Sequence, residues 1–201
     1  MKSLLIENST ENGSVAVADE GEVVIRLEFS KAGKLSSAVQ EIFLEVGAPN
    51  EIIVGIGPGS YTGLRVAAAT ATGLQLALRC PAFGCPSVLG YEAISYHVVG
   101  DARLGSIFLA SVEDKQLTRN PELLSIAEFE LLLPVLGSRP IFSVGPIPSH
   151  TYLPIFAPRA EYLLGCRNSF RPALEPIYLK EPHITGVGDG RSQKSEVRSQ
   201  K

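Results

Sequence analysis

Residues 55–65 read GIGPGSYTGLR, and this stretch decides how the rest of the sequence is interpreted. It follows an apolar run at 52–56 that is typical of a buried parallel strand, and it precedes a helical pattern at 64–79. Glycines in such a position let backbone amides approach an anion at a helix N-terminus. The candidate anion- or nucleotide-binding residues are Gly57, Gly59, Ser60, Thr62 and Gly63.

The loop matches neither common phosphate-binding fingerprint. Thr62 stands where G-x-G-x-x-G needs its third glycine, and no Gly-Lys-Ser/Thr follows for a P-loop. Pro58 also removes one amide donor. The alternative is that the glycines form a tight turn beneath a helix that packs closely on the sheet.

The flanking patterns indicate an α/β layer architecture on a mixed sheet. Apolar runs at 3–6, 14–18 and 23–29, joined by tight turns, predict an antiparallel meander, and the spacing at 36–46 predicts a helix. Beyond the loop we expect a helix at 87–99 with Ser87 as its N-cap, strands at 106–112 and 141–144, and a helix at 125–133. The expected organisation is an N-terminal lobe at 1–100, a degenerate C-terminal lobe at 101–185 and a disordered tail at 186–201.

Composition argues for a globular cytoplasmic protein. The chain has 201 residues, 45% of them apolar, with no run long enough to span a membrane and no signal-peptide pattern at the start. Its net charge of −3 gives no basic footprint for nucleic acid. The three cysteines fit no zinc spacing, and the three histidines share no helical ligand spacing. Ser60 lies in no G-x-S-x-G elbow, which disfavours a serine hydrolase.

The glycine segment resembles the G-x-G-P-G-S-F/Y-T-G-x-R signature of the TsaB/YeaZ family. Further similarity to this family lies at residues 4–10 with 14–17, at 86–89, at 101–105 and at 176–180. The resemblance implies an actin/Hsp70-like fold of two ribonuclease-H-like lobes, the second degenerate. It also implies a non-catalytic scaffold that activates TsaD, which transfers threonylcarbamoyl to the tRNA adenosine beside the anticodon.

The resemblance further implies TsaD and TsaE-like partners, a homodimer when the chain is alone, and contact with tRNA only through the complex. No cofactor is required of this chain, although ATP or ADP with magnesium at a subunit interface stays open. The alternative function is a small-molecule kinase or ATPase, with Gly57 to Gly63 on phosphates and Glu7 on magnesium. Against it, Glu7-Asn8-Ser9 replaces the family's Asp-Thr-Ser, and Leu35-Ser36-Ser37 replaces its His-Ser-Glu. We expect Glu7 to be a solvated residue at a strand end.

The helix at 64–79 carries small side chains that would let another helix come close. Residues four apart share a face, so Ala67 with Ala71 and Ala68 with Thr72 form two rows, one expected to face the sheet and the other to face away. The candidate partner-interface residues are Ala67, Ala68, Ala71, Thr72 and Gln75.

Overall fold

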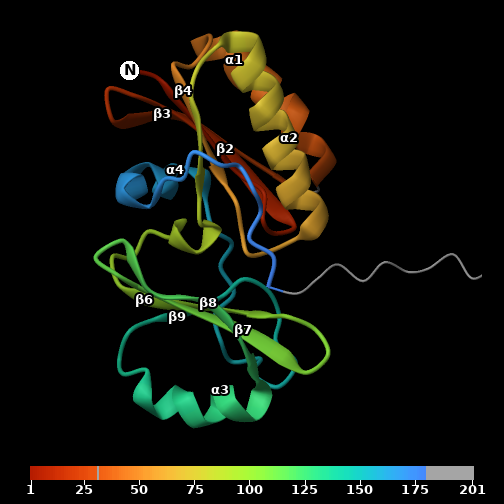
Figure 1. Ribbon diagram of the computed structural model, residues 1–201, viewed down its shortest axis with the longest axis vertical. Helices are drawn as coiled ribbons and strands as arrows, with labels where there is room; N and C mark the ends of the chain where they lie inside the picture. Colours follow the sequence, from red (N-terminus) through yellow and green to blue (C-terminus); the bar gives the residue numbers. More distant parts are fainter. Residues whose placement is uncertain (31, 180–201) are drawn as a thin grey trace, which may run out of the picture.

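The chain forms two mixed sheets, one above the other in Figure 1, in a computed structural model that describes residues 1–30 and 32–179. The upper sheet has the order β3-β2-β1-β4-β5, with β1, β2 and β3 antiparallel and β1, β4 and β5 parallel. Its strands are β1 (Ser3–Glu7), β2 (Asn12–Asp19), β3 (Glu22–Ser30), β4 (Glu51–Gly55) and β5 (Ala82–Cys85).

Two helices, α1 (Leu35–Val46) and α2 (Tyr61–Leu78), cover one face of this sheet. Strand residues such as Ile6 and Ile52 pack there against Ile42 of α1 and Ala67 of α2, all fully buried. Because the buried residues of α2 are glycine, leucine and alanine, this helix lies close to the sheet. The patterns predicted the meander, both helices and the parallel strand.

The lower sheet has the order β8-β7-β6-β9, with α3 (Ile126–Leu132) beneath it (Figure 1). Its strands are β6 (Tyr96–Asp101), β7 (Ser106–Glu113), β8 (Gln116–Ser125) and β9 (Ile141–Ser143). A reciprocal capping box between Ser125 and Glu128 starts α3. Phe129 of α3 packs on Val99 and Leu109 in a separate core below the sheet.

The C-terminal segment returns from the lower sheet to the upper one. Helix α4 (Ala160–Leu163) and the 3-10 helix η4 (Leu164–Ser169) pack between the sheets in a core that also includes Leu5 and Tyr96. The chain then pairs Arg171 with Gly84, and the amide of Ile177 donates to the carbonyl of Ile56 at 2.7 Å. Residues 160–177 therefore connect to the N-terminal sheet as well as to the lower one.

The predicted helix at 87–99 is wrong. Only a 3-10 turn forms at Ser87–Leu89, and β6 follows, where the β-branched Val98 and Val99 suit a strand. The hydroxyl of Ser87 does not cap a helix but accepts a hydrogen bond from the amide of Gly57 at 2.9 Å. Strands β5 and β8 were not predicted, and the predicted tail at 186–201 lies outside the described residues.

Candidate functional site

The turn after β1 fills the space left by the glycines of the 55–65 stretch. A Cβ added to Gly55 would lie 1.9 Å from Glu7 Oε2, one on Gly59 2.2 Å from the Ser9 carbonyl oxygen, and one on Gly63 2.1 Å from the Asn8 carbonyl oxygen. These distances are far inside van der Waals contact. The glycines therefore allow residues 7–9 to approach the loop directly.

Much of the loop's hydrogen-bonding capacity is used within the chain. Ser60 is the N-cap of α2: its amide donates to the Ser9 carbonyl at 2.7 Å, and its hydroxyl accepts from the Gly63 amide at 3.2 Å. The Gly57 amide donates to Ser87 Oγ. Helix α2 begins at Tyr61, earlier than the expected residue 64, so Thr62 and Gly63 belong to its first turn.

Glu7 is fully buried, which overturns the expectation of a solvated strand end. Its Oε1 accepts from the Ser9 amide at 2.7 Å, while Oε2 has no hydrogen-bond partner among the described residues. Burial raises the pKa of this carboxyl, and the hydrogen bond from Ser9 opposes that rise. Asn8 Oδ1 and Ser9 Oγ are also buried without a hydrogen-bond partner in the described part of the chain. The turn thus holds an enclosed carboxyl rather than one open to a metal nucleotide.

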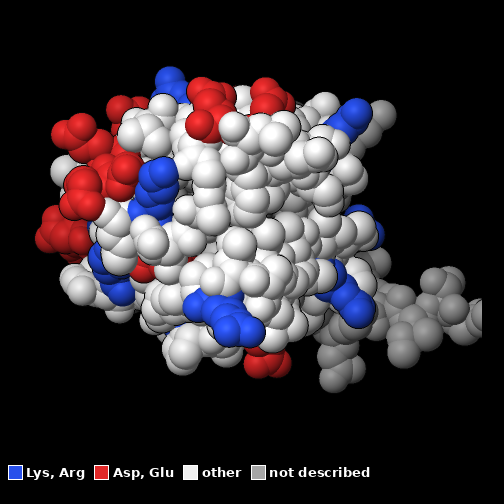
Figure 2. Space-filling model, turned by 90° about the horizontal axis from the view of Figure 1, so that it is seen from above, with Lys and Arg blue, Asp and Glu red and all other residues white. Residues whose placement is uncertain are grey.

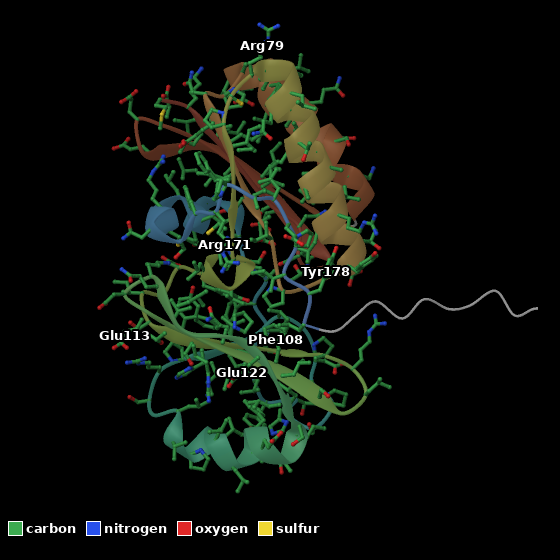
Figure 3. The ribbon with its side chains drawn as sticks, viewed as in Figure 1. Arg79, Phe108, Glu113, Glu122, Arg171 and Tyr178 are labelled. Carbon is green, nitrogen blue, oxygen red and sulfur yellow. The ribbon has the colours of Figure 1, made fainter. Side chains whose placement is uncertain are left out.

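An aromatic and cationic group lies at the exposed start of α2. Arg65 donates to the Tyr61 hydroxyl and lies over its ring, 5.1 Å from the centroid. Tyr178, labelled in Figure 3 near the lower end of α2, packs on Tyr61 with 5.3 Å between ring centroids. The unfavourable position of Arg65 at a helix N-terminus is thus offset by a contact within the chain.

The two small-residue rows of α2 separate as expected, one towards the sheet and one away. Ala67 and Ala71 are fully buried, whereas Ala68 is half-buried and Thr72 exposed; Gln75 is half-buried. The assignment of Ala67 and Ala71 to a partner surface is therefore wrong, because the chain's own sheet covers them.

A groove of about 550 Å³ runs between α1 and α2. Leu44, which lines it, is 83% exposed, and further along α2 Leu76 is 74% exposed. We call this surface the α1–α2 groove; it is lined by Ser36, Val39, Gln40, Phe43, Leu44, Ala69, Thr70, Gly73 and Leu74. The sequence patterns missed these residues. Leu44 could have indicated the surface, because it is a large apolar residue outside the apolar face of α1 formed by Leu35, Val39 and Ile42.

The described residues contain no cluster of three or more His, Cys, Asp or Glu side chains that could hold a metal ion. His97 is buried, with Nδ1 2.8 Å from Ser111 Oγ, and His150 is buried, with Nδ1 2.8 Å from Ser149 Oγ. Both act as hydrogen-bonded packing residues. The carboxylate of Asp101 accepts from the Arg103 amide at 2.8 Å within the β6–β7 turn.

No helix in the described ranges has the length and apolar character needed to cross a membrane. Viewed from above in Figure 2, acidic side chains gather at one edge while Lys and Arg side chains are scattered singly. That face offers no basic stripe for a nucleic acid backbone.

The sequence of this chain is similar to several known proteins. The family model described as TsaD, tRNA N6-adenosine threonylcarbamoyltransferase, matches residues 32–114. The Escherichia coli K12 tRNA threonylcarbamoyladenosine biosynthesis protein TsaB is 28% identical over 128 residues, 56% of this chain and 55% of that protein. The chain therefore spans about half the length of this relative. An uncharacterised Mycobacterium tuberculosis protein is 29% identical over 157 residues, covering 73% of this chain and 71% of that protein.

Solved structures agree on the fold. A Pseudomonas aeruginosa protein described as similar to peptidase YeaZ superposes with a TM-score of 0.70 at 22% identity, covering 89% of this chain and 99% of that one. A structure titled YeaZ, from the same organism, superposes with a TM-score of 0.66 over the same shares. The two mixed sheets and this likeness confirm the expected α/β actin/Hsp70-like class.

Proposed function

Because the chain belongs to the TsaB/YeaZ family, we propose that it is a non-catalytic subunit that supports TsaD in threonylcarbamoyl modification of tRNA. TsaD would transfer the threonylcarbamoyl group to the adenosine beside the anticodon, and this chain would stabilise and activate it. The similarity to the Escherichia coli protein named for tRNA threonylcarbamoyladenosine biosynthesis supports this pathway.

The observation that carries the non-catalytic role is the enclosed turn at residues 7–9. A carboxylate that served a magnesium nucleotide would need an open, ionised oxygen, but Glu7 is fully buried and burial favours its neutral form. Pro58 has no amide hydrogen, and the amides of Gly57, Ser60 and Gly63 already have acceptors in the chain. If ATP or ADP with magnesium takes part, we propose that it lies at a subunit interface.

The α1–α2 groove supports a partner role. Its apolar residues come from both α1 and α2, and the small residues Ala69 and Gly73 would let a neighbouring helix approach closely. A Cβ on Gly73 would meet nothing within 4 Å, so the groove is open at this point. We propose that helices of TsaD, or of a second copy of the chain, pack there.

The test is reconstitution of the modification reaction with purified TsaD, the threonylcarbamoyl adenylate and tRNA. We expect the rate to rise when this chain is added and to stay raised with Glu7→Gln, because Gln keeps the acceptor for the Ser9 amide. The isolated chain should show no ATP turnover. Magnesium-dependent turnover by the chain alone that disappears with Glu7→Gln would instead establish the kinase or ATPase alternative.

A further inference from the structure

A cavity of about 850 Å³ lies between the two sheets, apart from both the glycine turn and the α1–α2 groove. Its walls come from the facing ends of β2 and β3, from residues 90–93, and from residues 155–159 with Phe142 and Tyr162. The volume is in the usual range of ligand-binding pockets. We call it the interlobe cavity; it shares no lining residue with the groove.

Hydrogen bonds between distant parts of the chain fix the walls of this cavity. The Ala160 amide donates to Ser14 Oγ at 2.9 Å, and the Arg159 amide donates to the Gly90 carbonyl at 2.7 Å. The Tyr91 hydroxyl donates to the Phe156 carbonyl at 3.1 Å. The cavity is therefore preformed, so an occupant would not have to order its walls.

Aromatic side chains are concentrated in the interlobe cavity. The chain has eight Phe, six Tyr and no Trp, and five of these line this one cavity: Phe29, Tyr91, Phe142, Phe156 and Tyr162. Tyr91 stacks on Phe142 at 5.1 Å, and Phe142 meets Phe156 edge-on at 5.4 Å. Phe156 is nevertheless 52% exposed. An exposed aromatic surface in a preformed cavity favours an apolar or aromatic anchor.

The charges at the cavity argue against a nucleotide. Among the described residues that line it, the one cation, Arg159, lies 3.0 Å from the Glu28 carboxylate, and Glu92 adds a second carboxylate. The nearby ammonium group of Lys115 already donates to the Tyr91 carbonyl. In the described part of the lining, a phosphate would meet the Glu92 carboxylate and no unpaired cation, whereas an uncharged or basic peptide segment would meet no such repulsion.

We propose that the interlobe cavity binds a peptide segment of a partner protein, which inserts one aromatic or large aliphatic side chain against Phe142 and Phe156. Residues flanking the anchor would be uncharged or basic, to suit Glu92, because Glu28 is already paired with Arg159. Because the cavity and the α1–α2 groove are separate, the chain can hold this partner while another occupies the groove. This proposal does not depend on the proposed function.

The test uses a displayed library of random 12-residue peptides, selected against the full chain and then measured as labelled peptides by fluorescence polarisation. We expect enriched peptides with an aromatic or large aliphatic anchor and few acidic residues. Phe156→Ser should weaken them at least about tenfold, as expected for loss of an anchor contact. Tyr152→Ser removes another exposed aromatic ring, outside the cavity lining, and should leave binding unchanged.

Circular dichroism of Phe156→Ser checks that this variant remains folded. Peptides whose binding is weakened by Gly73→Gln bind the α1–α2 groove instead of the cavity. Ala93→Gln, which adds bulk to the cavity lining, provides a second variant that should weaken the same peptides. The proposal is overturned if no enriched peptide responds to either cavity variant. It is equally overturned if adenosine monophosphate, rather than apolar peptides, binds in a manner that depends on Phe156.

Discussion

Replacing Gly55 with alanine tests whether the glycine turn exists to enclose Glu7. The new Cβ would lie 1.9 Å from Glu7 Oε2 and 2.8 Å from Ser87 Oγ, whereas ordinary contact begins at 3.4 Å. The carboxyl must therefore retreat by about 1.5 Å, roughly one carbon–carbon bond. Because Glu7 is fully buried and Oε1 is bonded to the Ser9 amide, this retreat has no free space to use.

Overpacking of a buried site typically costs about 1–3 kcal/mol, and we expect Gly55→Ala to lie near 3 kcal/mol. Glu7→Asp alone should cost about 2 kcal/mol, from one buried methylene at about 0.8 kcal/mol and one weakened hydrogen bond at about 1 kcal/mol. Aspartate withdraws the carboxyl by about the distance that the new methyl needs. The double variant should therefore be more stable than additivity predicts, by about 1–2 kcal/mol.

Urea denaturation followed by far-UV circular dichroism measures these free energies of unfolding, since the chain has no Trp for fluorescence. For a chain of this size, 3 kcal/mol corresponds to a Tm lower by about 6–12 °C. Gly73→Ala is the matched control: nothing lies within 4 Å of its added Cβ, and in mid-helix it should be neutral or stabilising by up to about 1 kcal/mol. A Gly55→Ala variant that behaves like this control, or additive effects of Gly55→Ala and Glu7→Asp, would refute the close packing of Gly55 against Glu7.

Three further predictions follow from the site. Glu7→Gln should gain stability relative to the parent between the pKa of Glu7 in the unfolded chain and its raised pKa in the folded chain. In that pH range the native parent keeps a proton on Glu7 that the unfolded parent releases, so the parent loses stability as pH rises. Urea denaturation of both proteins at several pH values measures this, and a pH-independent difference would contradict it. Ala71→Gln should cost about 1–3 kcal/mol while Ala68→Gln leaves the Tm nearly unchanged, since only Ala71 is fully buried; equal Tm values would refute the orientation of α2. The isolated chain should bind tRNA weakly or not at all at physiological salt, because its net charge is −3; submicromolar affinity in a filter-binding assay would oppose this.

Sequence patterns predicted most elements of the first half of the fold, where each strand or helix has a regular spacing of apolar residues and turn residues at its ends. They failed at 87–99 because the run from Ser87 to Val99 is apolar enough for a helix, and only pairing with β7 and β9 makes its second half a strand. Strand β8 alternates half-buried and exposed residues but contains Pro121, which argued against a strand.

The sequence located the glycine turn, but the role of its glycines and the burial of Glu7 could be predicted only in part. The glycines at 55, 59 and 63 are explained by residues about 50 positions earlier, and no local pattern reveals that contact. The burial of Glu7 likewise depends on Gly55 and Ser87 from other elements. The small residues of α2 indicated close packing, but which row faces the sheet follows from the tertiary structure alone.

Light scattering of the purified chain mixed with its cognate TsaD tests the central claim most directly. We expect a stable complex that Gly73→Gln weakens, because the added side chain projects into the α1–α2 groove from a position where a Cβ meets nothing within 4 Å. Tyr152→Ser, at an exposed position outside the groove lining, should have the smaller effect. Absence of any complex, or a complex that tolerates Gly73→Gln as well as Tyr152→Ser, would contradict a scaffold role through this surface.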